Sequence, residues 1–166
     1  MKKNPYINKE DLKDIFDCCD IFNIEFKNMI PIILVFHGIG GKNLIEIINL
    51  SIEDFDKNNN IIKVKRNENI YKYFFQDEWF DFLYNYYSNG YKIKSKKDID
   101  DMLLSIMEAL GNNEINFDSI LKSGLINYIK ENKDNITYKD YVYIANLFNF
   151  NNIDDAIDII HLTRIM

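Results

Sequence analysis

Basic side chains are concentrated in the middle of the chain, within the segments IIKVKR and IYKYFF. The ones concerned are Lys63, Lys65, Arg66 and Lys72. Lysine and arginine attract and hydrogen-bond phosphate groups, so a cluster of them on one surface could bind phosphate. The surrounding residues 57–97 contain nine Lys or Arg and four Asp or Glu, a net charge of +5, whereas residues 1–56 and 98–166 have net charges of −4 and −7. Lysine on strands also protects sheet edges from pairing with other chains, so charge alone leaves both interpretations open.

The segment GIGGK and the two histidines are weaker candidates for chemistry. GIGGK, residues 38–42, has neither the spacing of a nucleotide-binding P-loop nor the Ser or Thr that follows its lysine. A glycine-rich turn is the favoured interpretation. His37 and His161 have no partner at a spacing typical of catalysis or metal binding, which favours structural roles for both.

The cysteines and the main cluster of carboxylates indicate no metal or cofactor site. Cys18 and Cys19 are adjacent, which disfavours a disulfide between them, and neither has a Cys or His at a metal-ligand spacing. Packing in or beside the core is favoured for both. Asp98, Asp100 and Asp101 suit the N-terminus of a helix, where negative charge is stabilising. We therefore expect no metal and no cofactor.

The composition is that of an ordinary globular domain. The chain has 166 residues, of which 47% are apolar and 28% charged, enough for one domain with a sizeable core. The best apolar run, residues 29–36, contains Pro31 and is too short to cross a bilayer. The N-terminal MKKNPYINKEDLK lacks the apolar core of a signal peptide. These features predict a cytoplasmic protein with no membrane partner, and the net charge of −6 argues mildly against nucleic acid.

The elements that position the basic residues are predicted from hydrophobic periodicity and turn residues. IIKVKR and IYKYFF alternate and are separated by NEN, so they predict a β-hairpin. Asn8 with Asp11, and Thr137 with Asp140, predict reciprocal helix caps. Helices are expected at about residues 9–19, 25–36, 42–50, 77–87, 98–110, 117–132, 137–148 and 152–162. This order predicts an α+β fold, mostly helical, with a small antiparallel β-hairpin sheet, in a single domain over residues 1–166.

The block EIINLSIEDFDKNNNIIKV, residues 46–64, has a distinctive pattern: a Glu, two apolar residues and a Leu, followed by an acidic turn that leads into a strand. Its key residues are Glu46, Leu50, Ile52, Glu53, Asp54, Phe55 and Asp56. This block and the order of the elements resemble the catalytic domain of tyrosine recombinases, the phage integrase family. The resemblance implies that family's fold, with the hairpin projecting toward DNA and Lys65 closest to the position of its catalytic lysine.

The positions that match the family's catalytic residues carry other side chains. Asn43 stands where the first arginine is expected, Lys122 where the second is, and Ser123 where a histidine follows it. The later Gly-His pair is replaced around residues 148–149, and no tyrosine follows Tyr143 to match the nucleophile. Strand cleavage needs phenolate attack on a phosphate held by cations. The resemblance therefore implies a domain with no catalytic residues and no enzymatic activity.

A narrower resemblance comes from the segments FHGIGGKNLIEIINLSIEDFD and ILKSGLINYIKEN, with a Gly-Lys pair before a polar amide at Gly41, Lys42 and Asn43. These segments resemble the recombinase-derived phage repressors of the SPβ lysis–lysogeny type. That family represses lytic genes by binding DNA and lacks recombinase activity. Its members also have an N-terminal core-binding domain, which we do not expect within these 166 residues.

These resemblances predict a catalytically inactive regulator of a phage or mobile element that binds DNA through the basic hairpin region. It would act alone or with a partner, either a second copy or a related phage repressor. The expected DNA-binding residues are Lys42, Asn43, Lys63, Lys65, Arg66, Lys72 and Lys122. The alternative is a protein-interaction module that antagonises a related repressor or recombinase without binding DNA. A C-terminal helix would then either pack on its own core or dock on the partner through Ile153, Ala156, Ile157, Ile160 and Ile165.

Overall fold

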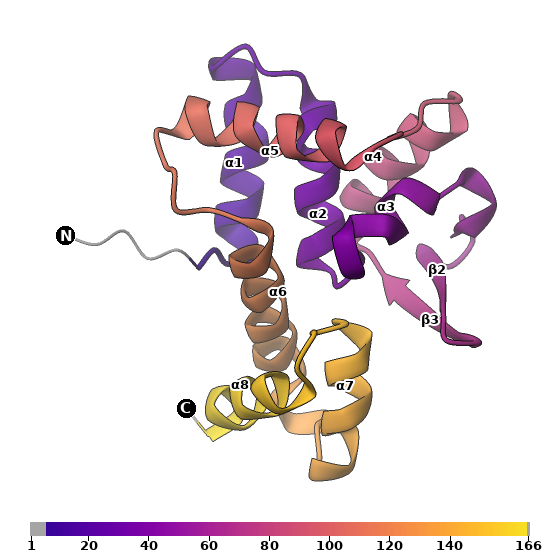
Figure 1. The fold of residues 1–166 in the computed structure, drawn as a ribbon, viewed down its shortest axis with the longest axis vertical. Coiled ribbons are helices and arrows are strands. Elements are labelled where there is room, and N and C mark those ends of the chain that lie inside the picture. Colours follow the sequence, from indigo (N-terminus) through magenta and orange to yellow (C-terminus); the bar gives the residue numbers. More distant parts are fainter. Residues whose placement is uncertain (1–5, 166) are drawn as a thin grey trace.

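The structure of the protein, a computed structural model, describes residues 6–165 (Figure 1). Its α-helices are α1 (Lys9–Ile21), α2 (Ile30–Phe36), α3 (Ile45–Asn49), α4 (Asp77–Ser88), α5 (Lys96–Leu110), α6 (Phe117–Asn132), α7 (Tyr141–Leu147) and α8 (Ile153–Ile165). The strands β1 (Phe55–Asp56), β2 (Ile61–Arg66) and β3 (Asn69–Phe74) form an antiparallel sheet in the order β1-β2-β3. The prediction of a mostly helical α+β fold with a small antiparallel sheet is confirmed. No helix within residues 6–165 is both long enough and apolar enough to span a bilayer.

Several helix ends follow from polar side chains that cap them. Asn8 accepts a hydrogen bond from the backbone N–H of Asp11, and the Asp11 carboxylate accepts one from the N–H of Asn8. Thr137 and Asp140 form the same reciprocal cap just before α7. Both caps were predicted, because a side-chain oxygen at this position satisfies N–H groups that the helix itself leaves without a partner.

Three predicted helices are shorter than expected. The one predicted at residues 137–148 is a 3₁₀ turn, Tyr138–Asp140, followed by α7. The other two, the second and the third of the chain, each have a local cause. The second is a 3₁₀ turn, Phe26–Met29, followed by α2, because Pro31 lies in the first turn of α2, where its missing N–H is not needed. The third begins only at Ile45, because Asn43 and Leu44 have φ values of 56° and 58°. Left-handed backbone at two consecutive residues cannot continue a right-handed helix.

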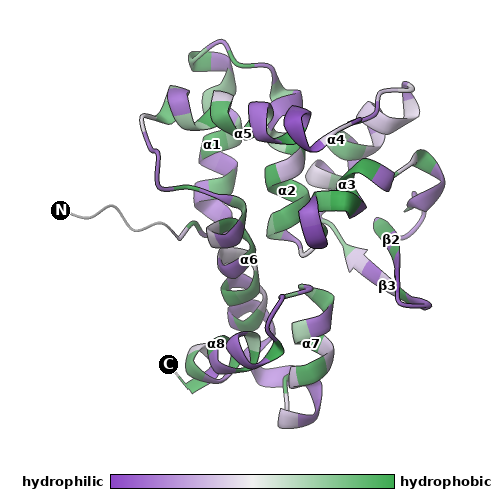
Figure 2. Ribbon diagram, viewed as in Figure 1, coloured by the Kyte–Doolittle hydropathy of each residue, from purple (hydrophilic) through white to green (hydrophobic). Residues whose placement is uncertain are grey.

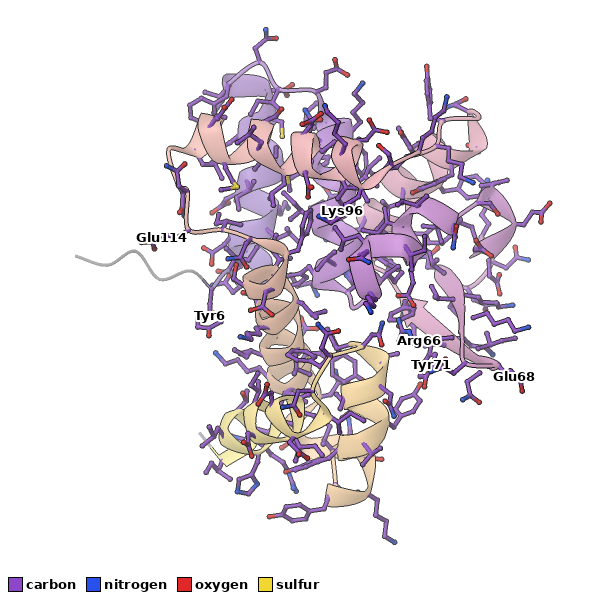
Figure 3. The ribbon with its side chains drawn as sticks, viewed as in Figure 1. Tyr6, Arg66, Glu68, Tyr71, Lys96 and Glu114 are labelled. Atoms are coloured by element: carbon purple, nitrogen blue, oxygen red, sulfur yellow. The ribbon has the colours of Figure 1, made fainter. Side chains whose placement is uncertain are left out.

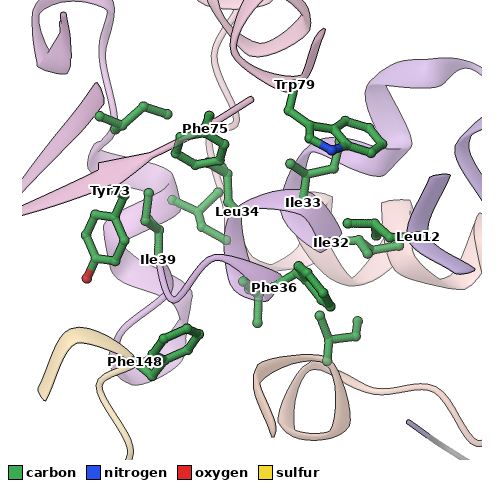
Figure 4. Packing of buried hydrophobic residues seen from close by; sticks show 14 of the residues in the cluster. Leu12, Ile32, Ile33, Leu34, Phe36, Ile39, Tyr73, Phe75, Trp79 and Phe148 are labelled. Carbon is green, nitrogen blue, oxygen red and sulfur yellow. The ribbon is translucent and has the colours of Figure 1, made fainter. Parts of the chain in front are cut away.

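The core is built around α2, whose seven residues are all buried. Its sequence IPIILVF has no polar face, so other elements must enclose it on all sides (Figure 4). α6 crosses α2 so closely that a Cβ atom at Gly124 would lie 1.8 Å from the carbonyl oxygen of Phe36. Figure 2 shows hydrophilic and hydrophobic residues alternating along α1, α5 and α6, as expected for helices with one buried face.

The C-terminal helix α8 packs on α6 and α7, at the far end of α6 from α1 and α5 (Figure 1). Ala156 and Ile160 are completely buried, whereas Ile153 and Ile165 are 39% and 65% exposed. The middle of the apolar face that the sequence indicated therefore packs on the chain's own core. Its two ends remain open to solvent.

Candidate nucleic-acid interface

The hairpin formed by β2 and β3 sorts its side chains onto two faces. Lys63 pairs directly with Lys72, and Lys65 pairs with Ile70. Successive residues of a strand point to opposite sides of the sheet, and residues directly opposite each other share a side. One side therefore carries Lys63, Lys65, Ile70, Lys72 and Phe74, which we call the outer face.

The turn between the two strands fixes this register. Asn67 and Glu68 have φ values of 50° and 67°, as in the two-residue turns that join tightly twisted strands. Figure 3 shows Glu68 at the tip of the hairpin, away from the helices. A slip of one residue would turn the whole outer face toward the core, so the turn decides which basic residues reach solvent.

The outer face is exposed, basic and partly apolar. Lys63, Lys65 and Lys72 are all exposed, and none of them forms an ion pair within residues 6–165. Lysines directly opposite each other repel, so an anion bound between Lys63 and Lys72 would relieve the repulsion. Ile70 and Phe74 are 63% and 70% exposed beside them. Such a face suits a phosphate-bearing ligand that also offers flat or apolar surface.

Arg66 does not belong to the outer face, which corrects its assignment to the DNA-binding residues. It follows Lys65 by one position, so strand alternation turns it inward, beside α7 (Figure 3). Its Nε and Nη2 atoms donate to the two carboxylate oxygens of Glu46, both at 2.7 Å, and Nη1 donates to the carbonyl oxygen of Asn146. Both side chains of the ion pair are only 10% exposed. A guanidinium held in this way has no free edge for a phosphate.

The Arg66 site joins α3, the hairpin and the end of α7. The Tyr73 hydroxyl accepts a hydrogen bond from Arg66 at 2.9 Å and donates one to the carbonyl oxygen of Leu147 at 2.6 Å. The guanidinium lies over the ring of Tyr71, 4.9 Å from its centroid. Burial is the largest single influence and lowers the pKa of Arg66, but the hydrogen bonds to Glu46 and Tyr73 and the charges of these two groups together outweigh it, and the pKa is raised overall. Burial also raises the pKa of Tyr73, so the cluster keeps one cation and a neutral hydroxyl and serves to anchor the hairpin.

Asn43 and Lys122 lie together in a cleft of about 520 Å³, whose lining also includes Asn149. These are three of the positions at which the resemblance expects catalytic residues of a recombinase. The structure thus brings them to one place, apart from the outer face. Lys42 is exposed in the short turn before α3 and does not line the cleft.

The charge of this cleft does not favour a phosphate. Its two lysines are already ion-paired, Lys122 to Asp118 at 3.0 Å and Lys96 to Asp100 at 3.3 Å, and all four residues line the cleft. Asp155 adds a third carboxylate to the lining. An anion placed there would meet net negative charge, whereas the outer face offers lysines that form no ion pair among residues 6–165.

Sequence reasoning missed two kinds of residue around the hairpin. Ile70 and Phe74 were not assigned to the site, although their alternation with Lys72 places them on the same face. Period-two alternation was the signal that could have found them, and it would also have separated Arg66 from Lys65. The pairing of Arg66 with Glu46 has no local signal, because the partners come from different elements.

The cysteines play the packing role that the sequence predicted. Cys18 is half-buried and Cys19 is buried, and both are free thiols. Burial raises the pKa of the Cys19 thiol, which disfavours the reactive thiolate. Residues 6–165 contain no group of three or more His, Cys, Asp or Glu placed to hold a metal ion.

Comparison with known proteins does not assign the chain to a family. No family model matches the sequence, and a search of curated proteins finds no match. The likeness to tyrosine recombinases therefore stays a prediction from the sequence.

Proposed function

We propose that the protein is a catalytically inactive, recombinase-like regulator of a phage or mobile element, and that it binds DNA through the outer face. The observation that carries this proposal is the exposure of Lys63, Lys65 and Lys72 on one side of the hairpin, with no carboxylate of residues 6–165 in an ion pair with them. Lysine contacts with phosphate position a protein on DNA without reading sequence. Binding through this face is therefore expected to be strongly salt-dependent.

The absence of strand cleavage is proposed from the side chains in and near the cleft. Asn43 carries no charge, and Lys122 is already ion-paired there. The Ser123 hydroxyl donates to the carbonyl oxygen of Ser119 at 2.7 Å and accepts from the backbone N–H of Ile7 at 3.0 Å, which supports a structural role. Without two free cations the charge that develops on a reacting phosphate has no stabilisation. We expect no covalent adduct with supercoiled or suicide DNA substrates, and a trapped phosphotyrosine would contradict the proposal.

The DNA-binding proposal is tested by neutralising the outer face. The variant carries Lys63→Gln, Lys65→Gln and Lys72→Gln, and binding to labelled duplex DNA is followed by fluorescence anisotropy over a range of salt concentrations. The matched control carries Lys13→Gln, Lys133→Gln and Lys139→Gln, which remove the same charge from exposed positions elsewhere. Both proteins have the same net charge, so a difference between them reports position and not overall charge.

We expect the outer-face variant to lose affinity for all duplex sequences alike. Each lost phosphate contact should lower the salt slope of log K by about 0.9, so the slope should fall by roughly two to three units. The control should keep most of the wild-type slope. Equal effects of the two triple variants, or no effect of either, would rule out the outer face as the DNA surface.

A second function, a protein-interaction module, is favoured by one observation at the other end of the molecule. Exposed apolar side chains gather in and just before α7 and on α8, where Tyr138, Val142, Leu162 and Ile165 are 68%, 53%, 58% and 65% exposed. Exposed apolar surface of this kind marks protein contacts. Light scattering on the wild type and on Val142→Ser with Leu162→Ser tests this function. A dimer that becomes monomeric in the variant supports it, and a wild-type monomer contradicts self-association.

A further inference from the structure

A cavity of about 580 Å³ lies between β3, the end of α2, α6 and α7. Aromatic rings from several of these segments line it, among them Phe75, Tyr128, Tyr143 and Phe148. Figure 4 shows Phe75 and Phe148 on different segments around the end of α2. A volume of this size, with several aromatic walls and a few polar groups, is typical of a site for a small molecule.

His37 places a hydrogen-bond acceptor, its Nε2 atom, in this cavity. Its Nδ1 atom lies 2.7 Å from the carbonyl oxygen of Ile33, so Nδ1 must carry the hydrogen and donate. Burial lowers the pKa of His37 to about 4, which keeps the ring neutral at ordinary pH. Nε2 is then an acceptor, and it has no hydrogen-bond partner within residues 6–165. One face of the ring is covered by Phe75, with centroids 4.2 Å apart. A ligand that completes this site must offer a hydrogen-bond donor.

The charges around the cavity favour an anionic group at one point. Lys9 and Glu131 both line it, and they neutralise each other in an ion pair of 2.9 Å. Lys72 also lines it and forms no ion pair within the described part of the chain. The side chains of Asn127 and Asn132 add amide donors and acceptors. The cavity thus combines flat apolar walls, the acceptor nitrogen Nε2 of His37, which needs a hydrogen-bond donor, and Lys72, a cation without an ion-pair partner among residues 6–165.

We propose that this cavity binds a nucleobase linked to a phosphate, either as a free nucleotide or as an unpaired base of a bound nucleic acid. Tyr143 stacks on the base, His37 Nε2 accepts a hydrogen bond from a base N–H, and Lys72 binds the phosphate. The nucleic-acid source rests on the proposed function, because Lys72 belongs to the outer face. The free-nucleotide source does not depend on it.

The first arm of the test uses free ligands and isothermal titration calorimetry. The probes are the monophosphates of adenosine, guanosine, cytidine and uridine, with inorganic phosphate as the reference for the anion alone. We expect at least one nucleotide to bind saturably and more tightly than phosphate. The same nucleotide with every base N–H replaced by N-methyl should bind at least tenfold more weakly, because His37 Nε2 would then lack its donor.

The second arm uses duplex DNA with one bulged base, compared with the same duplex whose bulge is abasic and with the fully paired duplex. Preference for the bulged base over the abasic bulge indicates that the base comes from nucleic acid. The fully paired duplex measures binding by the outer face alone. A protein that binds this duplex but shows no base preference and no nucleotide binding keeps the proposed function and loses the cavity proposal.

An exposed residue provides a variant that does not threaten the fold. Tyr143→Ala removes a ring that is 54% exposed and lines the cavity. Tyr138→Ala is the matched control, because this side chain is 68% exposed and does not line it. Loss of the stacking ring should weaken base binding by about tenfold or more, and the control should leave it unchanged. The proposal is overturned if no nucleotide and no bulged base binds better than its reference, or if Tyr143→Ala binds as well as the control.

Discussion

The two faces of the hairpin use basic residues in opposite ways. On the outer face Lys63 and Lys72 stand opposite each other, both exposed and neither in an ion pair with a carboxylate in the described part of the chain. On the inner face Arg66 gives its hydrogen bonds to Glu46, Tyr73 and backbone carbonyls. The outer lysines can therefore bind a ligand, whereas Arg66 is fully hydrogen-bonded within the protein and holds the hairpin to α3 and α7.

The difference shows why a count of charges is a poor guide to a binding surface. Residues 57–97 have a net charge of +5, but Arg66 contributes to that number without contributing to the surface. Lys96 and Lys97 likewise pair with Asp100 and Asp101 on α5. The face that remains for a phosphate is set by strand alternation and pairing, and it is smaller than the sequence suggests.

The largest expected effect is on the inner face, from Arg66→Ala. Removing the guanidinium leaves the Glu46 carboxylate, which is only 10% exposed in the intact pair, without its cation. Breaking one half of a buried ion pair costs about 3–5 kcal/mol, so the free energy of unfolding should fall by that amount. Urea denaturation measures it.

The double variant Glu46→Leu with Arg66→Met is the control for this interpretation. Replacing both partners by apolar side chains removes the uncompensated charge, so much of the lost stability should return. A fall of less than about 1 kcal/mol for Arg66→Ala would show that the pair does not anchor the hairpin.

The next effect concerns His37, whose ring packs on Phe75 just after β3. Burial is the main cause that lowers its pKa to about 4; Lys9 adds to the lowering, while the hydrogen bond to Ile33 and the charge of Glu131 oppose it. Between pH 6.5 and pH 4 the unfolded chain takes up a proton that the folded chain refuses, so stability falls as the pH falls. The ring also borders the cavity, where water can reach it, so we expect less than the full effect of the pKa shift. The free energy of unfolding should fall by about 2 kcal/mol over this pH range.

Unfolding measured at several pH values in this window, for the wild type and for His37→Phe, checks the assignment. Other groups contribute equally to both proteins, so the difference isolates His37. The free energy of unfolding should fall less steeply with falling pH in His37→Phe than in the wild type. Parallel pH dependences for the two proteins would contradict the assignment to His37.

A smaller loss is expected from Tyr73→Phe. The change removes the hydroxyl that joins Arg66 to the carbonyl oxygen of Leu147, which then keeps only a longer contact of 3.4 Å from Arg66. Leaving a buried carbonyl poorly satisfied costs about 1–2 kcal/mol. Tyr71→Phe keeps the ring beneath the guanidinium and is the matched control. Denaturation curves that coincide for the two variants would remove Tyr73 from the anchor.

The smallest effect is on the outer face, and there stability and binding should move in opposite directions. Lys72→Glu turns the like-charge pair with Lys63 into an attractive one, which should stabilise the fold by about 0.2–1 kcal/mol. The same change should weaken binding to duplex DNA, because a phosphate contact becomes a repulsion. Thermal melting and anisotropy together test both signs. Tighter DNA binding by the variant would contradict the assignment of this face.

Local patterns predicted the parts of the fold that local chemistry decides. β2 was predicted over its observed residues, and the caps at Asn8 and Thr137 were predicted from the side chains that make them. The left-handed backbone at Asn43 and Leu44 was missed, because nothing in their side chains requires it. The two-residue strand β1 was missed because two residues are too few to show alternation.

The candidate site could be predicted only in part, and for the same reason. The lysines of the outer face follow from the strand itself. Arg66, by contrast, is held away from that face by Glu46 and by the end of α7, which only tertiary packing brings to the hairpin. The cavity beside β3 likewise depends on four separate helices, so the sequence could indicate a structural role for His37 but not its place in the wall of a cavity.

The most direct test of the account compares Lys65 and Arg66, neighbours in sequence that lie on opposite faces. The measurement is the salt slope of log K for duplex DNA, in Lys65→Gln and in the double variant Glu46→Gln with Arg66→Gln, which removes the arginine charge without leaving a buried carboxylate unpaired. The slope should fall by about 0.9 in Lys65→Gln and should not change in the double variant. A slope that falls in the double variant and stays unchanged in Lys65→Gln would contradict the division of the hairpin into a binding face and an anchoring face.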